Sequence, residues 1–238
     1  MAALRWTWLG TLPYADAWSL QRRCAEMRRD GTLEHDLVLM LEHPPVFTMG
    51  RQGDVAHLGG GADALRAAGA EYIEVDRGGS VTFHGPGQLV AYPIVDLASM
   101  FPIPGHPRMG DVLRYVRALE QAVIDTAQQF GVTTERRPPF TGVWRGNDKL
   151  AAIGVKLARG VTTHGIGFNV NTDLAWFSLI TPCGIDGAGV CSLQTLGVRD
   201  VTPQRIAPHV AAALGDAFHA EFVADPFSLG PIAEPVAA

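Results

Sequence analysis

The sequence predicts an α+β fold in which a mixed or antiparallel sheet is flanked by helices. Short runs of apolar and β-branched residues follow one another more often than they alternate with helical patterns. Two long amphipathic stretches, 108–130 and 203–221, predict helices that cover the sheet. A chain of 238 residues can bury one large core, so we expect a single domain over 1–224 and a flexible tail over 225–238.

The N-terminal half alternates short strands with short helices. Apolar residues recur at every second position in the strands and at helical spacing in the helices. The expected elements are a strand over Leu4–Leu9, a helix over 13–29, one kinked strand or two strands over 36–50, a helix over Ala62–Ala68, a strand over Tyr72–Asp76, and two strands around the Gly-Pro-Gly turn of 80–97. Gly69 supplies the stop of the second helix.

The C-terminal half opens with the long helix Arg108–Phe130, which Gly131 ends. From Gly142 onward, strand patterns separated by turn residues predict consecutive hairpins. Their strands cover 142–144, 149–158 and 161–171. The last expected helix spans Pro203–Glu221.

Composition excludes several classes of protein. Hydrophobic residues make up 47% of the chain and charged residues 18%, so a disordered, collagenous or coiled-coil protein is excluded. A net charge of −5 is the wrong sign for a protein that coats nucleic acid. The start of the chain lacks the pattern of a signal peptide, and no apolar run is long enough to cross a membrane. We therefore expect a cytoplasmic protein that binds neither nucleic acid nor membrane.

Two glycine-rich segments each carry a histidine. RGGSVTFHGPGQ, from Arg77 to Gln88, lets backbone approach a ligand closely, although a tight turn would also explain its glycines. It is neither a Walker A loop, since no GK[ST] follows, nor a dinucleotide fingerprint, since no helix follows. His164–Gly167 repeats the His-Gly-x-Gly theme, so His84 and His164 could flank one pocket. Without carboxylates at ligand spacing, we expect no metal and no cofactor.

The three cysteines do not form a disulfide framework or a zinc motif, because no CxxC pair is present. Cys183 lies between a proline and a glycine, so we expect its thiol on an exposed turn, where it is either reactive or structural. Cys24 falls on the apolar face of the first helix, and Cys191 begins a strand. Both are expected in the core.

The chain contains only two lysines, Lys149 and Lys156, although it is rich in arginine. Coding bias toward arginine explains this scarcity. A spacing of seven residues places the two side chains on opposite faces of one strand, so only one of them can line a shared pocket. Lys149 continues the apolar alternation of Ala151, Ile153 and Val155, which favours it slightly, while a solvent-exposed lysine at the strand end remains the alternative.

Three segments, 77–88, 142–174 and 180–185, together resemble the lipoyl(octanoyl) transferase family. The resemblance extends over most of the chain, from about 37 to 196. It implies a fold like that of the biotin and lipoate protein ligases. It also implies transfer of an octanoyl group from acyl carrier protein to a lysine on lipoyl domains, namely those of the E2 subunits of 2-oxoacid dehydrogenases and the glycine cleavage H protein.

The resemblance also implies roles for individual residues. The family's nucleophilic thiol, which carries the acyl group as a thioester, corresponds to Cys183, and the lysine that heads the K-L-A-A-I-G stretch corresponds to Lys149. The substrate-binding stretches correspond to Arg77, Gly78, Gly79, Ser80, Val81, Thr82, Phe83, His84, Ala152, Ile153, Gly154, Gly165, Ile166 and Gly167. Gly167 departs from the alanine of many relatives, and we expect it to widen the acyl tunnel slightly.

These roles predict a ping-pong reaction without ATP. The Lys149 ammonium would stabilise the Cys183 thiolate during attack on the octanoyl thioester, and Lys149 would later accept a proton from the incoming amine. His84 or His164 could assist, and the residues alone do not choose between them. An ATP-dependent lipoate ligase of the same fold is the alternative enzyme. A non-catalytic acyl-binding module is the alternative outside enzymology.

Overall fold

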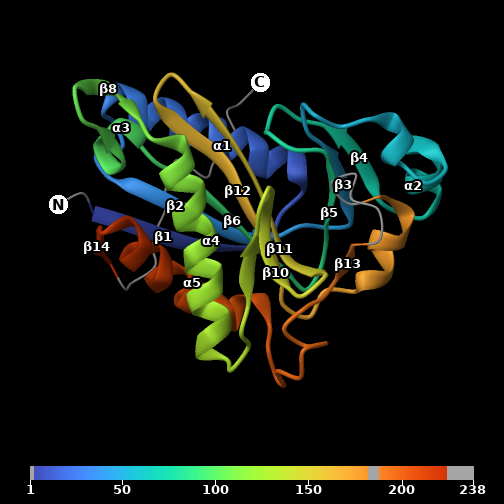
Figure 1. The fold of residues 1–238 in the computed structure, drawn as a ribbon. Helices are drawn as coiled ribbons and strands as arrows, with labels where there is room; N and C mark the ends of the chain where they lie inside the picture. The colour runs from blue at the N-terminus through green and yellow to red at the C-terminus, as the bar shows by residue number, and fades with distance from the viewer. Residues whose placement is uncertain (1–2, 182–187, 224–238) are drawn as a thin grey trace.

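The computed structural model describes residues 3–181 and 188–223, and a mixed sheet forms its centre (Figure 1). The strands of this larger sheet are β1 (Ala3–Thr11), β2 (Asp36–Glu42), β6 (Gln88–Ile94), β9 (Glu135–Arg137), β10 (Phe140–Arg145), β11 (Asp148–Ala158), β12 (Val161–Asn169), β13 (Gly189–Val190) and β14 (Glu221–Phe222). They lie in the order β14-β1-β2-β6-β12-β11-β10-β9, with β13 paired to β11. β1 runs parallel to β2 and β14, and the centre of the sheet is antiparallel.

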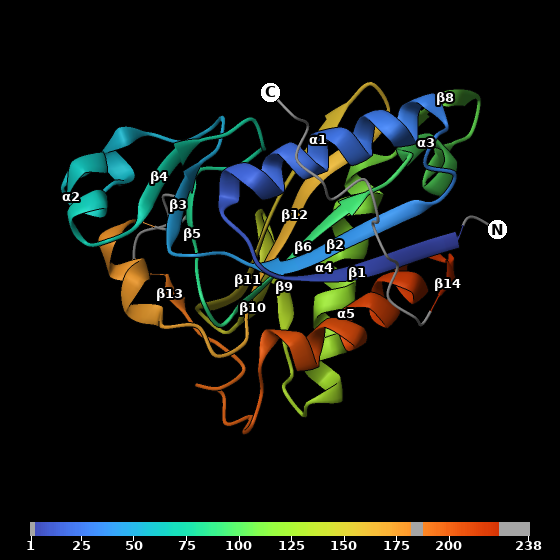
Figure 2. The ribbon, with the colours of Figure 1, turned by 180° about the vertical axis from the view of Figure 1, so that it is seen from behind.

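Helices cover both faces of this sheet. α1 (Tyr14–Asp30) lies on one face, and α4 (Val112–Gln129) and α5 (Pro203–Phe218) pack together on the other (Figures 1 and 2). The central strands are therefore buried on both sides, as β2 shows. Its Leu37 and Leu39 pack against α1, while Val38 packs into the core below α4 and α5.

A smaller sheet lies beside the larger one. It consists of β3 (Val46–Met49), β4 (Glu71–Glu74) and β5 (Val81–His84), in the order β4-β3-β5. Around it lie the short helices η1 (Val55–His57), α2 (Gly61–Ala67) and η2 (Leu174–Leu179). Phe83 stacks on Trp176 of η2 with ring centroids 5.3 Å apart, so the C-terminal half of the chain closes the core of this sheet.

The predicted fold class is confirmed, and most predicted elements are present. Residues 36–50 form two strands, and these belong to different sheets. The Gly-Pro-Gly turn likewise connects the two sheets, since β5 belongs to the smaller sheet and β6 to the larger. The helix predicted from Arg108 is wrong at its start. His106–Gly110 is a strand, β8, that pairs with β7 (Pro102–Ile103), and the helix begins after Asp111, whose carboxylate accepts a hydrogen bond from the Arg114 N–H at 2.9 Å.

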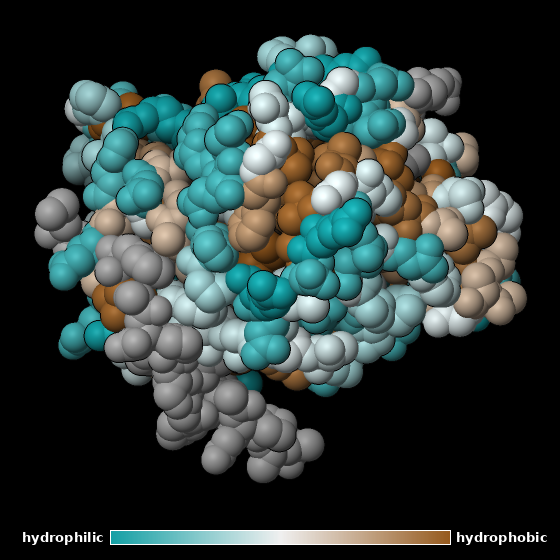
Figure 3. All heavy atoms as spheres, turned by 90° about the horizontal axis from the view of Figure 1, so that it is seen from below, coloured by the Kyte–Doolittle hydropathy of each residue, from teal (hydrophilic) through white to brown (hydrophobic). Residues whose placement is uncertain are grey.

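A short helix and the character of the surface complete the outline. The short helix α3 (Leu97–Met100) precedes β7, and the tail predicted over 225–238 lies outside the described residues. Within the part of the chain that the structure describes, no helix is long and apolar enough to cross a membrane. Seen from below, the largest group of apolar residues lies right of centre and is bordered by hydrophilic ones (Figure 3).

Candidate active site

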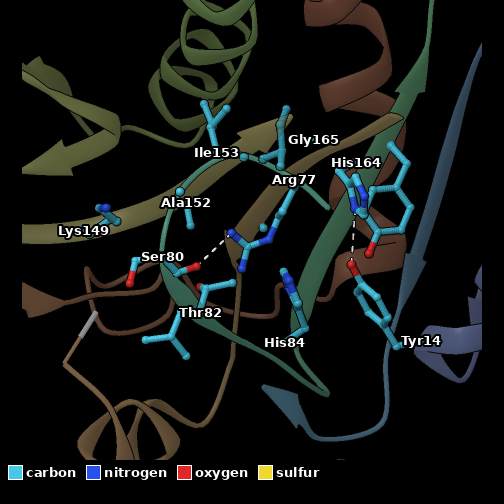
Figure 4. A pocket seen from close by; sticks show the side chains of 16 residues that line it. Tyr14, Arg77, Ser80, Thr82, His84, Lys149, Ala152, Ile153, His164 and Gly165 are labelled. Carbon is cyan, nitrogen blue, oxygen red and sulfur yellow. Dashed lines mark hydrogen bonds between the residues drawn. The ribbon is translucent and has the colours of Figure 1, made fainter. Parts of the chain in front are cut away.

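A narrow cleft of about 40 Å³ lies between the two sheets (Figure 4). β11 and β12 form its floor, the segment from Arg77 to Thr82 forms its roof, and Tyr14 and His164 lie at one end. The ring of Tyr92, which also lines the cleft, contacts that of His164. Its lining includes most of the residues that the family resemblance singled out, namely Arg77, Gly79, Ser80, Val81, Thr82, His84, Lys149, Ala152, Ile153, Gly154, Gly165, Ile166 and Gly167. Gly78 is not part of the lining, and Phe83 belongs to the core of the smaller sheet.

A register shift in β11 turns Lys149 toward this cleft. Trp144 pairs with Lys149, but Val143 pairs with Ala151, so β11 contains one more residue than β10 at this point. Because the extra residue reverses the alternation of faces, Lys149 and Ala151 lie on opposite sides of the sheet. The prediction that Lys149 continues the face of Ala151 is therefore wrong. Lys149 shares the cleft face with Ala152 and Gly154. Alternation from Gly154 places Lys156 on this face too, so the prediction that the two lysines lie on opposite faces is also wrong.

Lys149 is nearly buried at the other end of the cleft, with 5% of its surface exposed. Its ammonium nitrogen lies 4.6 Å from the centre of the Trp144 ring, which is a cation–π contact. A Cβ atom on Gly142 would meet the Ala151 carbonyl oxygen at 2.7 Å and the Lys149 Cε at 3.4 Å. The backbone N–H of Gly142 donates to buried Glu120 at 3.1 Å. Trp144 and Gly142 thus fix the direction of the lysine side chain.

Arg77 holds the roof of the cleft in place. Its guanidinium donates to the Thr48 carbonyl and hydroxyl oxygens, both at 2.8 Å, and to the carbonyl oxygens of Ser80 at 2.9 Å and Gly78 at 3.0 Å. These bonds join the Arg77–Ser80 loop to β3. Gly154 lets the roof approach the floor, since a Cβ there would lie 3.0 Å from the Gly78 carbonyl oxygen.

His84 is buried in the cleft as a neutral imidazole. The amide nitrogen of Gln88 donates to Phe83 and Asn169, so its oxygen accepts from Nδ1–H of His84 at 2.7 Å. Burial lowers the pKa of His84 well below its usual value, and the charges of His43 and Arg77 act in the same direction. Nε2, for which the structure gives no hydrogen bond among the described residues, keeps its lone pair.

His164 uses both ring nitrogens inside the protein. The Tyr14 hydroxyl donates to Nδ1 at 3.2 Å (Figure 4), and Nε2–H donates to Asp76 at 3.0 Å. The second carboxylate oxygen of Asp76 accepts from the Lys156 ammonium. Hydrogen bonding to His164, followed by that to Lys156, holds the pKa of Asp76 well below its usual range. Burial lowers the pKa of His164 despite the neighbouring carboxylate, so His164 is also neutral.

The two described cysteines are in the core, as predicted. Burial raises the pKa of the Cys24 thiol to about 11 and that of Cys191 to about 12, so neither is a thiolate near neutral pH. Cys183 lies outside the described residues. The strand that follows it places Val190 opposite Lys149. Among residues 3–181 and 188–223, no three His, Cys, Asp or Glu side chains group as metal ligands.

Sequence reasoning missed four side chains of this site: Tyr14, Asp76, Tyr92 and Trp144. Tyr14 begins a helix and Tyr92 lies within an apolar strand, so both look like ordinary core residues in the sequence. Asp76 directly precedes the glycine-rich segment 77–88, and this position in the sequence was the one indication that it could belong to the site. Trp144 precedes Lys149 by five residues, and this spacing allows the two residues to pair across a tight hairpin.

Comparison with known proteins agrees with the motifs. The family model described as the lipoyl protein ligase A/B catalytic domain matches residues 13–215. The octanoyltransferase of Rubrobacter xylanophilus is 49% identical over 187 residues, which is 78% of this chain and 80% of the relative. That of Solibacter usitatus is 47% identical over 206 residues, which is 85% of this chain and 89% of the relative.

Solved structures share the fold at low sequence identity. A lipoate-protein ligase A bound with ATP has a TM-score of 0.73 at 16% identity, covering 98% of this chain and 93% of that one. A biotin protein ligase from Aquifex aeolicus in complex with biotin and ATP has a TM-score of 0.51 at 12% identity, covering 92% and 71%. The biotin and lipoate ligase-like architecture is thus confirmed. The chain belongs to the lipoyl protein ligase A/B catalytic-domain family and, within it, to the octanoyltransferases.

Proposed function

We propose that this enzyme moves an octanoyl group from acyl carrier protein to a lysine of lipoyl domains, through a thioester on Cys183. The proposed acceptors are the E2 subunits of 2-oxoacid dehydrogenases and the glycine cleavage H protein. The observation that carries the proposal is the nearly buried ammonium of Lys149, held against Trp144 at one end of a cleft narrow enough for an alkyl chain. The relatives are named octanoyltransferases, which supports octanoyl as the acyl group that is transferred.

In the first half-reaction, the thiolate of Cys183 attacks the carbonyl carbon of the octanoyl thioester. A new C–S bond forms, the bond to the carrier breaks, and the carrier thiolate leaves and takes up a proton from the Lys149 ammonium, which becomes a neutral amine. A thioester replaces a thioester, so the step requires no ATP. The Lys149 ammonium stabilises the attacking thiolate. Val190, seven residues after Cys183, pairs with Lys149, which supports the closeness that this role requires.

In the second half-reaction, the amine of the acceptor lysine attacks the acyl-enzyme. An amide C–N bond forms, the C–S bond breaks, and the amine loses a proton. Lys149 and His84 are the bases that the cleft offers. Of the two histidines left open by the sequence, His84 fits better, because its Nε2 keeps a lone pair whereas both nitrogens of His164 are occupied.

The floor of the cleft suits an alkyl chain. The floor residues that line the cleft besides Lys149 and His164 are all uncharged and apolar or small, namely Ala152, Ile153, Gly154, Gly165, Ile166 and Gly167. Each methylene buried there contributes about 0.8 kcal/mol. The binding energy of an eight-carbon chain is therefore ample to hold it without any charged contact.

The experiment is an intact-mass measurement after mixing the enzyme with octanoyl-acyl carrier protein without ATP. We expect an octanoyl adduct that disappears in Cys183→Ser and persists in Cys191→Ser, the matched control in the core. Addition of a lipoyl domain should move the adduct to one lysine of that domain. No adduct, or lipoyl-domain modification only with ATP, would contradict the proposal and favour the ligase alternative.

The role of Lys149 has a separate test. The alkylation rate of Cys183 against pH reports the pKa of its thiol. Lys149→Met should raise that pKa, because the stabilising charge is lost, whereas Lys156→Met should leave it unchanged. Lys156 is the matched control, since it is the second lysine on the same face of β11 and is paired with Asp76. The reverse result would assign the role to Lys156.

A further inference from the structure

We propose that His164 closes the acyl cleft at the end opposite Lys149 and thereby sets the longest acyl chain that the enzyme accepts. It rests on the proposed function, because the cleft is taken as the acyl site. His164 then acts as a specificity-determining residue rather than as the assisting base considered from the sequence.

The length of the floor matches an eight-carbon chain. From Ala152, the floor residue nearest Lys149, to Val155, which pairs with His164, the strand advances three residues, or about 10 Å. A fully extended octanoyl chain spans about 9 Å with ordinary bond lengths and angles. The cleft ends at the imidazole of His164, which lies opposite Lys149 (Figure 4).

The wall that His164 forms is held rigidly. The side chain is 1% exposed and is bonded to Tyr14 and Asp76, and the Asp76 carboxylate is in turn paired with Lys156. The backbone N–H of His164 donates to Gln21 at 2.7 Å, and its φ of 57° is a left-handed conformation that L-residues seldom adopt. A longer chain could displace the ring only by breaking these buried bonds.

A second cavity lies behind the wall. Its volume is about 130 Å³, and its lining combines the apolar side chains of Trp18, Ala25, Ala158 and Val161 with charged ones that include Asp76 and Lys156. The imidazole of His164 contacts an aromatic ring in the lining of each space. Its ring centre is 6.3 Å from that of Tyr92, which lines the cleft, and 6.1 Å from that of Trp18, which lines the second cavity. Removal of the imidazole would therefore join the two cavities and lengthen the space available to an acyl chain.

The test is His164→Gly, assayed with octanoyl-, decanoyl- and dodecanoyl-acyl carrier protein. Glycine adopts a positive φ without strain, which offsets part of the lost contacts. We expect the ratio of kcat/KM for dodecanoyl to octanoyl transfer to rise at least tenfold over wild type. The matched control is His219→Gly. His219 also has a positive φ, 52°, but it lies at the end of α5, so the ratio should stay at the wild-type value.

Two outcomes overturn the proposal. One is an unchanged chain-length ratio in folded His164→Gly, and the other is an equal loss of transfer for all three chains. If His164→Gly fails to fold, His164→Asn replaces it, because asparagine tolerates the left-handed conformation and is shorter than histidine. Failure of wild type to transfer octanoyl at all would instead refute the proposed function.

Discussion

The cleft contains two buried neutral histidines that are held in opposite ways. His84, at the end of β5, donates from Nδ1 to Gln88 and keeps Nε2 available. His164, within β12, accepts at Nδ1 from Tyr14 and donates from Nε2 to Asp76. The two rings are therefore opposite tautomers. Because tautomer and bonding decide what an imidazole can do, one ring can receive a proton from a substrate and the other serves as a wall.

The largest effect that tests this difference is on the rate of acyl transfer to the acceptor lysine. His84→Ala should lower the rate of this second half-reaction about 10²- to 10⁴-fold, the usual contribution of a general base. His164→Gly should lower octanoyl transfer far less. Single-turnover transfer from preformed acyl-enzyme to a lipoyl domain measures both. An undiminished rate in His84→Ala would leave Lys149 as the base, and His84 would then have no role in proton transfer to distinguish it from His164.

The dependence of the free energy of unfolding on pH tests whether the buried histidines His43, His84 and His164 are neutral. Burial lowers the pKa of His43 to about 4, and it lowers those of His84 and His164 as well. Between pH 6.5 and 4 the unfolded chain therefore binds more protons than the folded one, and stability falls as pH falls. His43 alone accounts for a loss of about 3 kcal/mol by pH 4.

Urea unfolding at pH 7.0, 5.5 and 4.5 measures this loss, and His43→Gln should flatten the pH profile. A histidine that folding makes more basic would give the opposite sign, with stability gained on acidification. A gain that disappears in His164→Gly would mean that His164 is protonated beside Asp76, and the two rings would no longer be comparable.

How much of this site follows from sequence differs from residue to residue. The motifs bring His84, Lys149 and Gly154 to one cleft, and the structure does place them there. Alternation of side chains fails at Lys149, because one extra residue in β11 reverses the faces. Nothing in the local pattern K-L-A-A-I-G marks that extra residue. Its position depends on pairing with β10 across the hairpin, which is a tertiary property.

The elements show the same division. Helices with a clear apolar stripe, such as α1 and α5, are predicted to within a few residues. The predicted helix extends back to Arg108, but the residues before Asp111 form a strand that pairs with β7 in a hairpin. Likewise the role of His164 depends on Asp76, Tyr14 and a second cavity, which lie far from it in the sequence. Local pattern predicts elements, and distant contacts decide what each side chain does.

The next effect concerns the floor beside His164. A Cβ on Gly165 would lie 2.3 Å from the Ala91 carbonyl oxygen and 2.7 Å from Cδ of Pro93, both on the neighbouring strand β6. Neither can move without shifting the centre of the sheet. Gly165→Ala should therefore destabilise the fold by about 1–3 kcal/mol, measured by urea unfolding at pH 7. A neutral result would show that β12 is free to shift and that the wall at His164 is not rigid.

The smallest effect is expected at Gly167, and it acts on the other histidine, His84. A Cβ there would lie 3.0 Å from the Gln88 amide oxygen and 3.3 Å from Cε1 of His84. These are side-chain atoms, so a shift of a few tenths of an ångström relieves the contact, and Gly167→Ala should cost less than about 1 kcal/mol in stability.

The same substitution should also affect catalysis. The new methyl group would contact the hydrogen-bonded pair of Gln88 and His84, so it would shift the proposed base His84 as well as narrow the cleft. We therefore expect the rate of transfer to the acceptor to change by a factor of about two to five, with the ratio of dodecanoyl to octanoyl transfer unchanged. A changed ratio with an unchanged rate would mean that Gly167 acts on chain length, as the sequence suggested, and that the two ends of the cleft are not separate in function.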